Sequence, residues 1–475
     1  MRRHALLTVC LLLATLFFVP AGAQASASRG YLVVLAGTQT ASGFDASATD
    51  LQIASALRTA GGTVRNDLSG QVGVLVIESP SVDFAGLLMT TGVADVVGRD
   101  FSWHGIPPGG GPEPIDDPLE APQWDMQMIH TDEAHDIQTG APSVDVGVLD
   151  SGIDGHHPDF EKAGVSNVDC ARGRNSITFL PTGPGVGTPD PCTDNQFHGT
   201  HVAGTIGARA NGIGIVGVAP NVTLVPVKVC DASGYCYASA VVDGVTYAGD
   251  QRFDVINMSF FVDDNELQQS TEFKCMDEPT QRAFRLAVER AMQYARNQGV
   301  TPVAALGNSD EDLAHPSEPN ENNCDVVPAE TKGVIGTMAL GSRSEKANYS
   351  NYGTGATDVG APGGNGTTGD CRTTILSTIP GGGYACIQGT SMASPHTAGM
   401  AALIVSQFGT LGADGDVGMS PTRVEQYLQS TTFDIGLAGY DECFGNGRID
   451  ALRAVTHDTS RAYDASAPPC PEYAE

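Results

Sequence analysis

The sequence predicts an α/β fold in which an open, mostly parallel sheet carries helices on both faces and a small α+β unit comes first. Three observations support this prediction. Within residues 117–455, continuous apolar runs alternate with segments of helical spacing, the pattern of buried parallel strands and their connecting helices. Residues 30–103 show a separate β-α-β-β-α-β order. A stretch rich in proline and glycine, residues 104–116, predicts an exposed linker between the two parts.

The first 27 residues have the three-part layout of a secretory signal peptide. Arg2 and Arg3 precede an apolar run from Ala5 to Val19, and small residues follow at positions 21–27. The run is about 15 residues long, short of the ~20 needed to span a bilayer. We therefore expect a secreted, soluble, extracellular protein.

Residues 30–103, called the N-terminal module below, are predicted to be ferredoxin-like because of their element order. They contain no obvious catalytic constellation. The strand candidates are Tyr31 to Leu35, Gln71 to Glu78 and Val93 to Val97, and the helix candidates are Ser47 to Ala60 and Ser81 to Thr91.

The main unit, residues 117–455, is predicted to place its site at the carboxyl ends of its parallel strands. Residues 456–475 form a short tail. The strand candidates are Ser143 to Leu149, Thr223 to Val229, Asp254 to Met258, Thr301 to Ala305 and Gly333 to Met338. The helix candidates include Thr200 to Ala208, Ala238 to Gln251 and Pro279 to Asn297.

Ten cysteines follow the signal segment, an even number in a chain predicted to be exported, and this favours disulfides. Metal binding is disfavoured because no C-x-x-C pair or zinc-like spacing occurs. The sequence does not fix the connectivity. Pairing neighbours gives plausible local loops, and this is our working hypothesis: Cys170 with Cys192, Cys230 with Cys236, Cys275 with Cys324, Cys371 with Cys386, and Cys443 with Cys470.

The chain is strongly acidic, with a formal net charge of −30. Phosphate binding needs concentrated lysine and arginine, so we expect neither nucleic acid nor an anionic membrane as a partner. The acidity is consistent with solubility outside the cell, with cation binding or with a saline habitat. We expect a monomer.

Three short segments place residues of catalytic type at the ends of predicted elements. In DVGVLDSGID, an apolar strand ends at Asp150. In HGTHVAG, His198 opens a helix. In GTSMASPH, Ser391 starts a long apolar helix that runs to Phe408. Each of these residues alone is more simply explained as a turn former or a helix cap, but the three together indicate a catalytic triad.

A serine hydroxyl is a weak nucleophile at neutral pH and needs an imidazole to accept its proton. A carboxylate must hold the other ring nitrogen of that imidazole, because it fixes the tautomer and stabilises the imidazolium. Asp150, His198 and Ser391 provide these three groups. Their order along the chain differs from those of chymotrypsin and the α/β-hydrolases.

These segments resemble those of the subtilisin-like serine peptidases, over about residues 117 to 455. The resemblance implies a secreted serine endopeptidase that acts on proteins or peptides through an acyl-enzyme on Ser391, with no cofactor for catalysis. It also implies that Asn308, after the strand in AALGN, stabilises the oxyanion together with the Ser391 amide.

In that family, two backbone stretches line the cleft and pair with the extended substrate. The matching stretches here begin at Ser259 and Ala304. Bulky side chains follow the first serine, where the family usually has small residues, and they either reshape the pocket or pack in the core. The substrate-binding candidates are Ser259, Phe260, Phe261, Ala304, Ala305, Leu306 and Gly307.

The resemblance also implies a structural calcium ion bound by Asp159 and Asn211. Oxygen ligands on a loop suit a hard cation. The alternative is an Asx turn in a glycine-rich loop.

The N-terminal module is similar to the inhibitory propeptides of the family. We expect the enzyme to remove its own module by cleaving in or near the linker, and the module to act as an intramolecular inhibitor until then. The alternative is a permanently retained accessory domain.

Two other functions are less consistent with these motifs. A lipase or esterase would carry Gly-x-Ser-x-Gly after a strand, whereas Ser391 lies in Gly-Thr-Ser-Met-Ala. A catalytically inactive, subtilisin-shaped binding protein is disfavoured because the triad candidates and Asn308 are all present.

Overall fold

The computed structural model describes residues 28–106, 123–177, 189–262, 278–314, 325–412, 417–464, 467–468 and 470. Its larger part is built on a seven-stranded sheet in the order β11-β12-β8-β14-β15-β16-β17, and all neighbouring strands are parallel. The predicted signal peptide lies outside the described residues. The strands are β8 (Asp145–Asp150), β11 (Arg174–Asn175), β12 (Thr223–Lys228), β14 (Val255–Met258), β15 (Thr301–Ala305), β16 (Ile335–Leu340) and β17 (Val359–Pro362).

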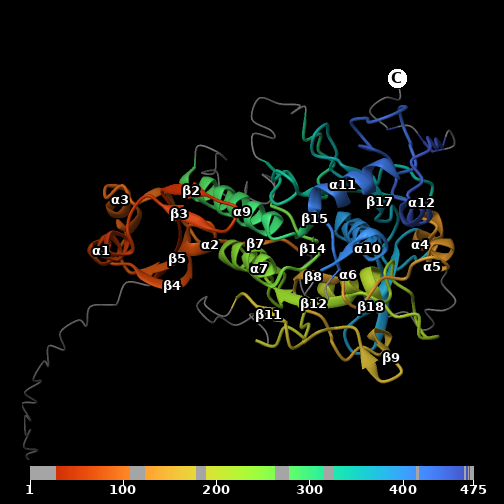
Figure 1. Ribbon diagram of the computed structural model, residues 1–475, viewed down its shortest axis with the longest axis horizontal. Helices are drawn as coiled ribbons and strands as arrows, with labels where there is room; N and C mark the ends of the chain where they lie inside the picture. The colour runs from red at the N-terminus through yellow and green to blue at the C-terminus, as the bar shows by residue number, and fades with distance from the viewer. Residues whose placement is uncertain are drawn as a thin grey trace, which may run out of the picture.

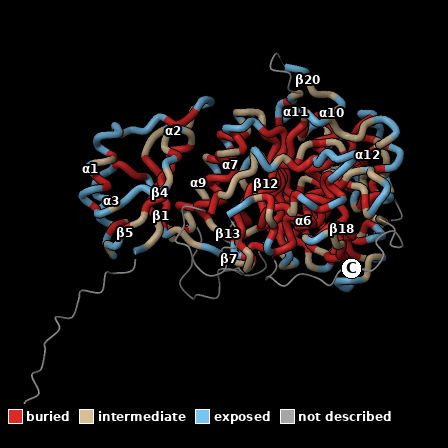
Figure 2. Tube along the Cα trace, turned by 90° about the horizontal axis from the view of Figure 1, so that it is seen from below, coloured by how far each residue is buried: buried red, intermediate tan, exposed pale blue. Residues whose placement is uncertain are grey.

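Helices cover both faces of this sheet, as predicted (Figure 1). Successive side chains of a strand point to opposite faces, so Val148 lies in an apolar core with α6 and α10, whereas Leu149 lies in a second core with α7 and α9. Figure 2 shows buried residues, in red, gathered in the interior of the larger part. The helices are α4 (Trp124–Met128), α5 (Thr131–His135), α6 (His198–Gly207), α7 (Ala238–Gln251), α9 (Pro279–Asn297), α10 (Thr390–Phe408), α11 (Pro421–Ser430) and α12 (Ala451–Thr456).

The N-terminal module contains a four-stranded antiparallel sheet in the order β4-β5-β1-β6. Tyr31 and Val33 point from β1 toward α1 and α3, while Leu32 and Val34 point to the other face. The succession of long elements is the predicted β-α-β-β-α-β. They are β1 (Arg29–Leu35), α1 (Asp50–Ala60), β4 (Thr63–Leu68), β5 (Val74–Ser79), α3 (Phe84–Met89) and β6 (Ala94–Arg99), with the shorter β2 (Gly37–Gln39), β3 (Phe44–Ala46) and α2 (Ser69–Val72) between them.

The module packs against α7 and α9 of the larger part, as Figure 1 shows. Leu32 and Val34 share an apolar core with Phe284 of α9. Arg290, also on α9, donates hydrogen bonds to the carbonyl of Leu35 at 2.9 Å and to Asp95 Oδ2 at 2.9 Å. The module and the larger part therefore share one continuous apolar core.

A short strand after the module crosses into the larger part. This strand, β7 (Ser102–His104), pairs antiparallel with β13 (Tyr235–Tyr237). Gly105 and Ile106, which we assigned to an exposed linker, are buried as a consequence. Residues 107–116 of the predicted linker lie outside the described residues.

Four of the five predicted disulfides are present: Cys170–Cys192, Cys230–Cys236, Cys371–Cys386 and Cys443–Cys470. The fifth predicted pair, Cys275 with Cys324, lies outside the described residues. Among the residues that the structure describes, no helix is both long and apolar enough to cross a membrane.

Candidate functional site

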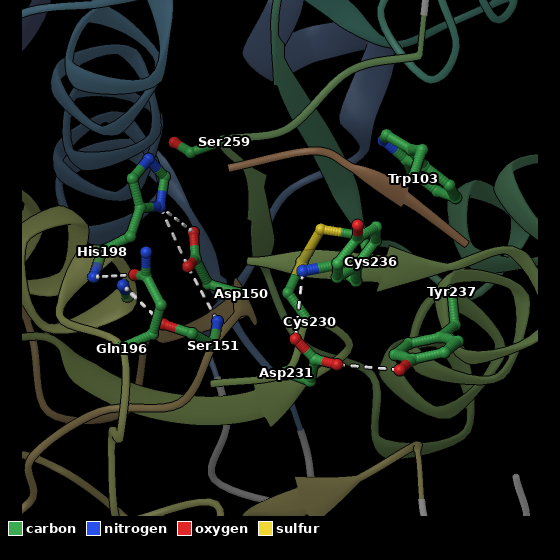
Figure 3. Close-up of a disulfide and its surroundings, with 12 residues drawn as sticks. Trp103, Asp150, Ser151, Gln196, His198, Cys230, Asp231, Cys236, Tyr237 and Ser259 are labelled. Atoms are coloured by element: carbon green, nitrogen blue, oxygen red, sulfur yellow. Dashed lines mark hydrogen bonds and ion pairs between the residues drawn. A yellow bond between two sulfur atoms is a disulfide. The ribbon is translucent and has the colours of Figure 1, made fainter. Parts of the chain in front are cut away.

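Asp150 and His198 meet as a fully buried pair at the carboxyl edge of the sheet (Figure 3). Asp150 ends β8 and His198 begins α6. His198 Nδ1 lies 2.9 Å from Asp150 Oδ2 and 3.0 Å from Oδ1. Because an ionised carboxylate only accepts hydrogen bonds, this contact places the ring proton on Nδ1. His198 Nε2 is buried and has no hydrogen-bond partner among the described residues, so it is available as a proton acceptor.

A second carboxylate, Asp194, holds the start of α6 and was not singled out from the sequence. Its Oδ2 accepts hydrogen bonds from the amide and hydroxyl of Thr200 at 3.0 and 2.7 Å. Its Oδ1 accepts from the hydroxyl of Ser151 at 2.9 Å and from the amides of Gln196 and Phe197. Asp194 thus joins the residue after Asp150 to the turn that carries His198.

Ser391 is the second residue of α10, and its side chain hydrogen-bonds to the strand next to β8. Ser391 Oγ donates to the carbonyl of Ser259 at 3.0 Å, and Ser259 Oγ donates to the carbonyl of Ser391 at 2.7 Å. Ser259 follows β14, which pairs with β8 so that Met258 lies opposite Leu149. Ser391 is therefore tied to the position level with Asp150 on the neighbouring strand. Ser391 is 5% exposed.

Asn308 lies beside the N-terminus of α10. Its Oδ1 accepts hydrogen bonds from the amide and the hydroxyl of Thr390, both at 2.9 Å. Those bonds turn the Nδ2 amide group away from Thr390. A Cβ atom on Gly389 would lie 3.6 Å from the Ser391 amide nitrogen and 3.7 Å from Asn308 Nδ2. Both nitrogens therefore lie near one point beside Gly389, two residues before Ser391.

The two stretches predicted to line a cleft come together at Phe261 and Gly307. A Cβ atom on Gly307 would lie 3.3 Å from Phe261 Cδ2, so the half-buried ring lies against this glycine. Phe260 is fully buried, which agrees with the core-packing alternative for that side chain. The remaining candidates, Ala304, Ala305 and Leu306, are also fully buried.

Residues 102–104 of the protein's own chain lie against the first of these two stretches. Trp103 of β7 is opposite Cys236 of β13, and its Nε1 donates to the carbonyl of Phe261 at 2.9 Å. Figure 3 shows Trp103, the Cys230–Cys236 disulfide and the Asp150–His198 pair in one view. The segment that leaves the N-terminal module thus contacts one of the predicted cleft stretches.

The predicted calcium ligands lie on neighbouring loops. Asp159 Oδ2 accepts from the Ile215 amide at 2.9 Å, while its buried Oδ1 has no hydrogen-bond partner among the described residues. Burial raises the pKa of Asp159 to about 6. Asn211 donates to the carbonyls of Pro158 and Glu161 and accepts from Ile213 through Oδ1. Within the described residues, no group of three or more His, Cys, Asp or Glu side chains is arranged to hold a metal.

Comparisons with known proteins agree on one family. A family model described as the subtilase family matches residues 142–447. The thermophilic serine proteinase of Bacillus sp. strain AK1 is 32% identical over 345 residues, which are 72% of this chain and 69% of that protein. Subtilisin E of Bacillus subtilis is 34% identical over 335 residues, which are 70% of this chain and 71% of that protein.

A solved structure matches nearly the whole chain. The crystal structure of a mutant of the epidermin leader peptide processing serine protease from Staphylococcus aureus has a TM-score of 0.70, covering 90% of this chain and 99% of that one at 21% identity. At this level of identity, the match concerns the fold.

Proposed function

Because this chain belongs to the subtilase family, a family of serine proteases, we propose that it is a secreted serine endopeptidase that is made as a self-processing precursor. The observation that carries the proposal is the buried Asp150–His198 pair, whose Nε2 has no hydrogen-bond partner among the described residues. Ser391, at the N-terminus of α10, hydrogen-bonds to Ser259, which follows the neighbouring strand β14.

In the first step, Ser391 Oγ attacks the carbonyl carbon of the scissile peptide bond and passes its proton to His198 Nε2. Asp150 holds the Nδ1 proton and stabilises the imidazolium. The imidazolium then gives its proton to the leaving amine, the C–N bond breaks, and an acyl-enzyme ester remains on Ser391. Water repeats the sequence: its proton goes to Nε2, its oxygen attacks the ester, and the Ser391 hydroxyl is restored.

Negative charge develops on the carbonyl oxygen in each addition step. Asn308 Nδ2 and the Ser391 amide both lie near one point beside Gly389, and in this proposal both donate a hydrogen bond to the oxyanion. Thr390 orients the Asn308 amide before substrate arrives. Such preorganised donors lower the barrier because they need no rearrangement as charge appears.

The N-terminal module acts as the inhibitory propeptide in this proposal, and cleavage between residues 104 and 116 releases it. Three features support this role: the module buries apolar surface against α9, Arg290 ties it there, and β7 lies on β13 at the cleft. The apolar segment at residues 1–27 would direct export.

We also propose one structural calcium ion at Asp159 and Asn211. Asp159 Oδ1 is the supporting observation, because it is buried and has no hydrogen-bond partner among the described residues. Such a carboxylate oxygen is costly unless a cation or donor completes it. The ion would hold two loops together and takes no part in the chemistry.

The proposal is tested by comparing the wild type with Ser391→Ala and, as a control, Ser420→Ala, which changes an exposed serine at the N-cap of α11. Wild type and Ser420→Ala should lose the module by intact mass and digest casein. Ser391→Ala should keep the module and leave casein intact. Processing of purified Ser391→Ala at the wild-type rate would refute self-processing through this serine.

A further inference from the structure

The segment that follows the N-terminal module lies on the larger part as an added strand. Trp103 pairs with Cys236 and His104 with Tyr235, antiparallel, at the edge where β13 would otherwise be open. Ile106 continues along it, with its amide 3.5 Å from the carbonyl of Gly234. If this chain is the endopeptidase proposed above, this segment is its first substrate, and its contacts report what the cleft accepts.

The side chain of Trp103 fills an aromatic slot. Its ring centroid lies 5.5 Å from that of Phe284 and 6.4 Å from that of Phe260, and Trp103 is only 4% exposed. The slot also has a polar contact, since the indole Nε1 donates to the carbonyl of Phe261 at 2.9 Å. A leucine or phenylalanine at this position would fill part of the slot but would offer no donor to that carbonyl.

Two residues after Trp103, at Gly105, the neighbouring atoms leave no room for a side chain. A Cβ atom on Gly105 would lie 2.7 Å from Cys236 Sγ and 2.6 Å from Trp103 Nε1. Both neighbours are held in place: Cys236 is fully buried and bonded to Cys230, and the indole is fixed by its slot. Glycine is the residue that this position accepts.

We propose that the enzyme selects protein segments of the form Trp-x-Gly on the amino side of the bond it cleaves. Tryptophan is held by Phe260, Phe284 and the carbonyl of Phe261, and glycine lies against the Cys230–Cys236 disulfide. This inference rests on the proposed endopeptidase function and names its substrate class. Its specificity residues lie outside the triad.

The test uses the mature enzyme and internally quenched peptides that contain residues 101–106 followed by Ala-Ser. One peptide keeps the natural sequence, one has leucine in place of Trp103, and one has alanine in place of Gly105. A fourth has alanine in place of Ser102, which is exposed in the structure and serves as the control. Each is assayed for kcat/KM after the fraction of enzyme labelled by a fluorophosphonate has been measured.

The leucine and alanine peptides should each lose about tenfold or more in kcat/KM. Leucine cannot donate the hydrogen bond that the indole makes, and the methyl group of alanine would clash where only glycine fits. The Ser102 control should remain within about twofold, since an exposed side chain contributes little. In the enzyme, Phe260→Ala should reduce the discrimination between tryptophan and leucine, with kcat/KM for both peptides calculated on the fraction of enzyme that the fluorophosphonate labels.

Equal kcat/KM for all four peptides with an enzyme that labels fully would overturn the Trp-x-Gly inference and leave the endopeptidase function standing. Discrimination that Phe260→Ala does not reduce would overturn the assignment of the slot. An enzyme that neither labels nor cleaves any peptide after loss of the module would overturn both proposals.

Discussion

At the scale of single residues, the position of His198 depends on a carboxylate that does not touch its ring. Asp194 is buried and binds Ser151, which follows Asp150, as well as three backbone amides at the start of α6. Gln196 adds a hydrogen bond to the His198 amide at 2.7 Å. These hydrogen bonds fix the turn before α6, and that turn fixes the orientation of the His198 ring.

Replacing Asp194 with asparagine should lower kcat by roughly 10- to 100-fold. A buried donor that loses its acceptor costs ~1–3 kcal/mol, and the donors that Asp194 binds lie in the turn that positions His198. KM should change less than kcat, because Asp194 makes no hydrogen bond to β13, the strand proposed to bind the substrate. Steady-state kinetics measure the changes in kcat and KM separately, with the exposed-site variant Asp132→Asn as the control. An equal loss in Asp132→Asn, or a loss confined to KM, would contradict a positioning role.

The motifs at Asp150 and His198 predicted the contact between these two side chains, because both residues occupy the ends of elements where the sequence pattern changes. Asn308 was predicted only from the family resemblance of AALGN. Asp194 gave no comparable signal, since an aspartate in a polar loop is an ordinary turn residue. Trp103 was overlooked because it adjoins the proline-glycine stretch, and its pairing with Cys236 joins residues far apart in the chain.

At the scale of elements, helices α7 and α9 and strand β15 have the bounds that the apolar pattern predicted. Other elements had weaker patterns. The strand β4 has only one buried residue, Leu68, because it lies at the sheet edge, and it does not show as an apolar run. The hairpin of β18 (Ile375–Ile379) and β19 (Gly383–Ile387) lies outside the main sheet. Its strands do not alternate with helices along the chain, so the pattern did not predict them.

The N-terminus of α7 receives a carboxylate from the segment that follows β6. Asp100 accepts hydrogen bonds from the amide of Ser239 at 3.1 Å and from its hydroxyl at 2.6 Å. Burial nevertheless raises the pKa of Asp100 from 3.8 to about 6. On release of the module, Asp100 would return to water and to its ordinary pKa.

A group with a raised pKa in the bound state takes up a proton on binding, so this contact favours association at low pH and weakens it as the pH rises from 3.8 through about 6. The cleaved module should therefore dissociate more readily at pH 7.5 than at pH 4.5, by roughly tenfold or more. Size-exclusion chromatography of the processed protein at both pH values measures the free module.

Asp100→Asn should flatten this dependence, whereas Asp83→Asn, an exposed acid of the same module, should preserve it. A pH dependence of equal size in Asp100→Asn would assign the effect to other groups.

At the scale of the whole molecule, the two largest sheets of the described residues are joined through helices that both of them contact. The open face of the module sheet uses the same apolar core as α7 and α9, and the other core holds α6 and α10 behind the site. The sequence predicted two units joined by a linker at residues 104–116, and those bounds stay a prediction. It did not reveal that the module sheet packs on α9. Side chains on both faces of β1 are apolar, so the sequence does not show which face contacts the larger part.

Calcium at Asp159 and Asn211 should stabilise the larger part, because a ligand that binds only the folded state raises its stability by mass action. Chelation with EDTA should lower the Tm of the mature enzyme by about 2–4 °C, as a loss of about 1–2 kcal/mol does for a domain of this size. Asp159→Asn should have a lower Tm in calcium and no response to EDTA. If EDTA leaves the Tm of the wild type unchanged, the calcium site is wrong.

The most direct measurement for the triad is to label the mature enzyme with a fluorophosphonate and map the modified residue by mass spectrometry. The account predicts a single adduct on Ser391 and loss of labelling in His198→Ala, because the hydroxyl reacts only when Nε2 accepts its proton. An adduct on another residue, or no adduct once the N-terminal module has been removed, would contradict it.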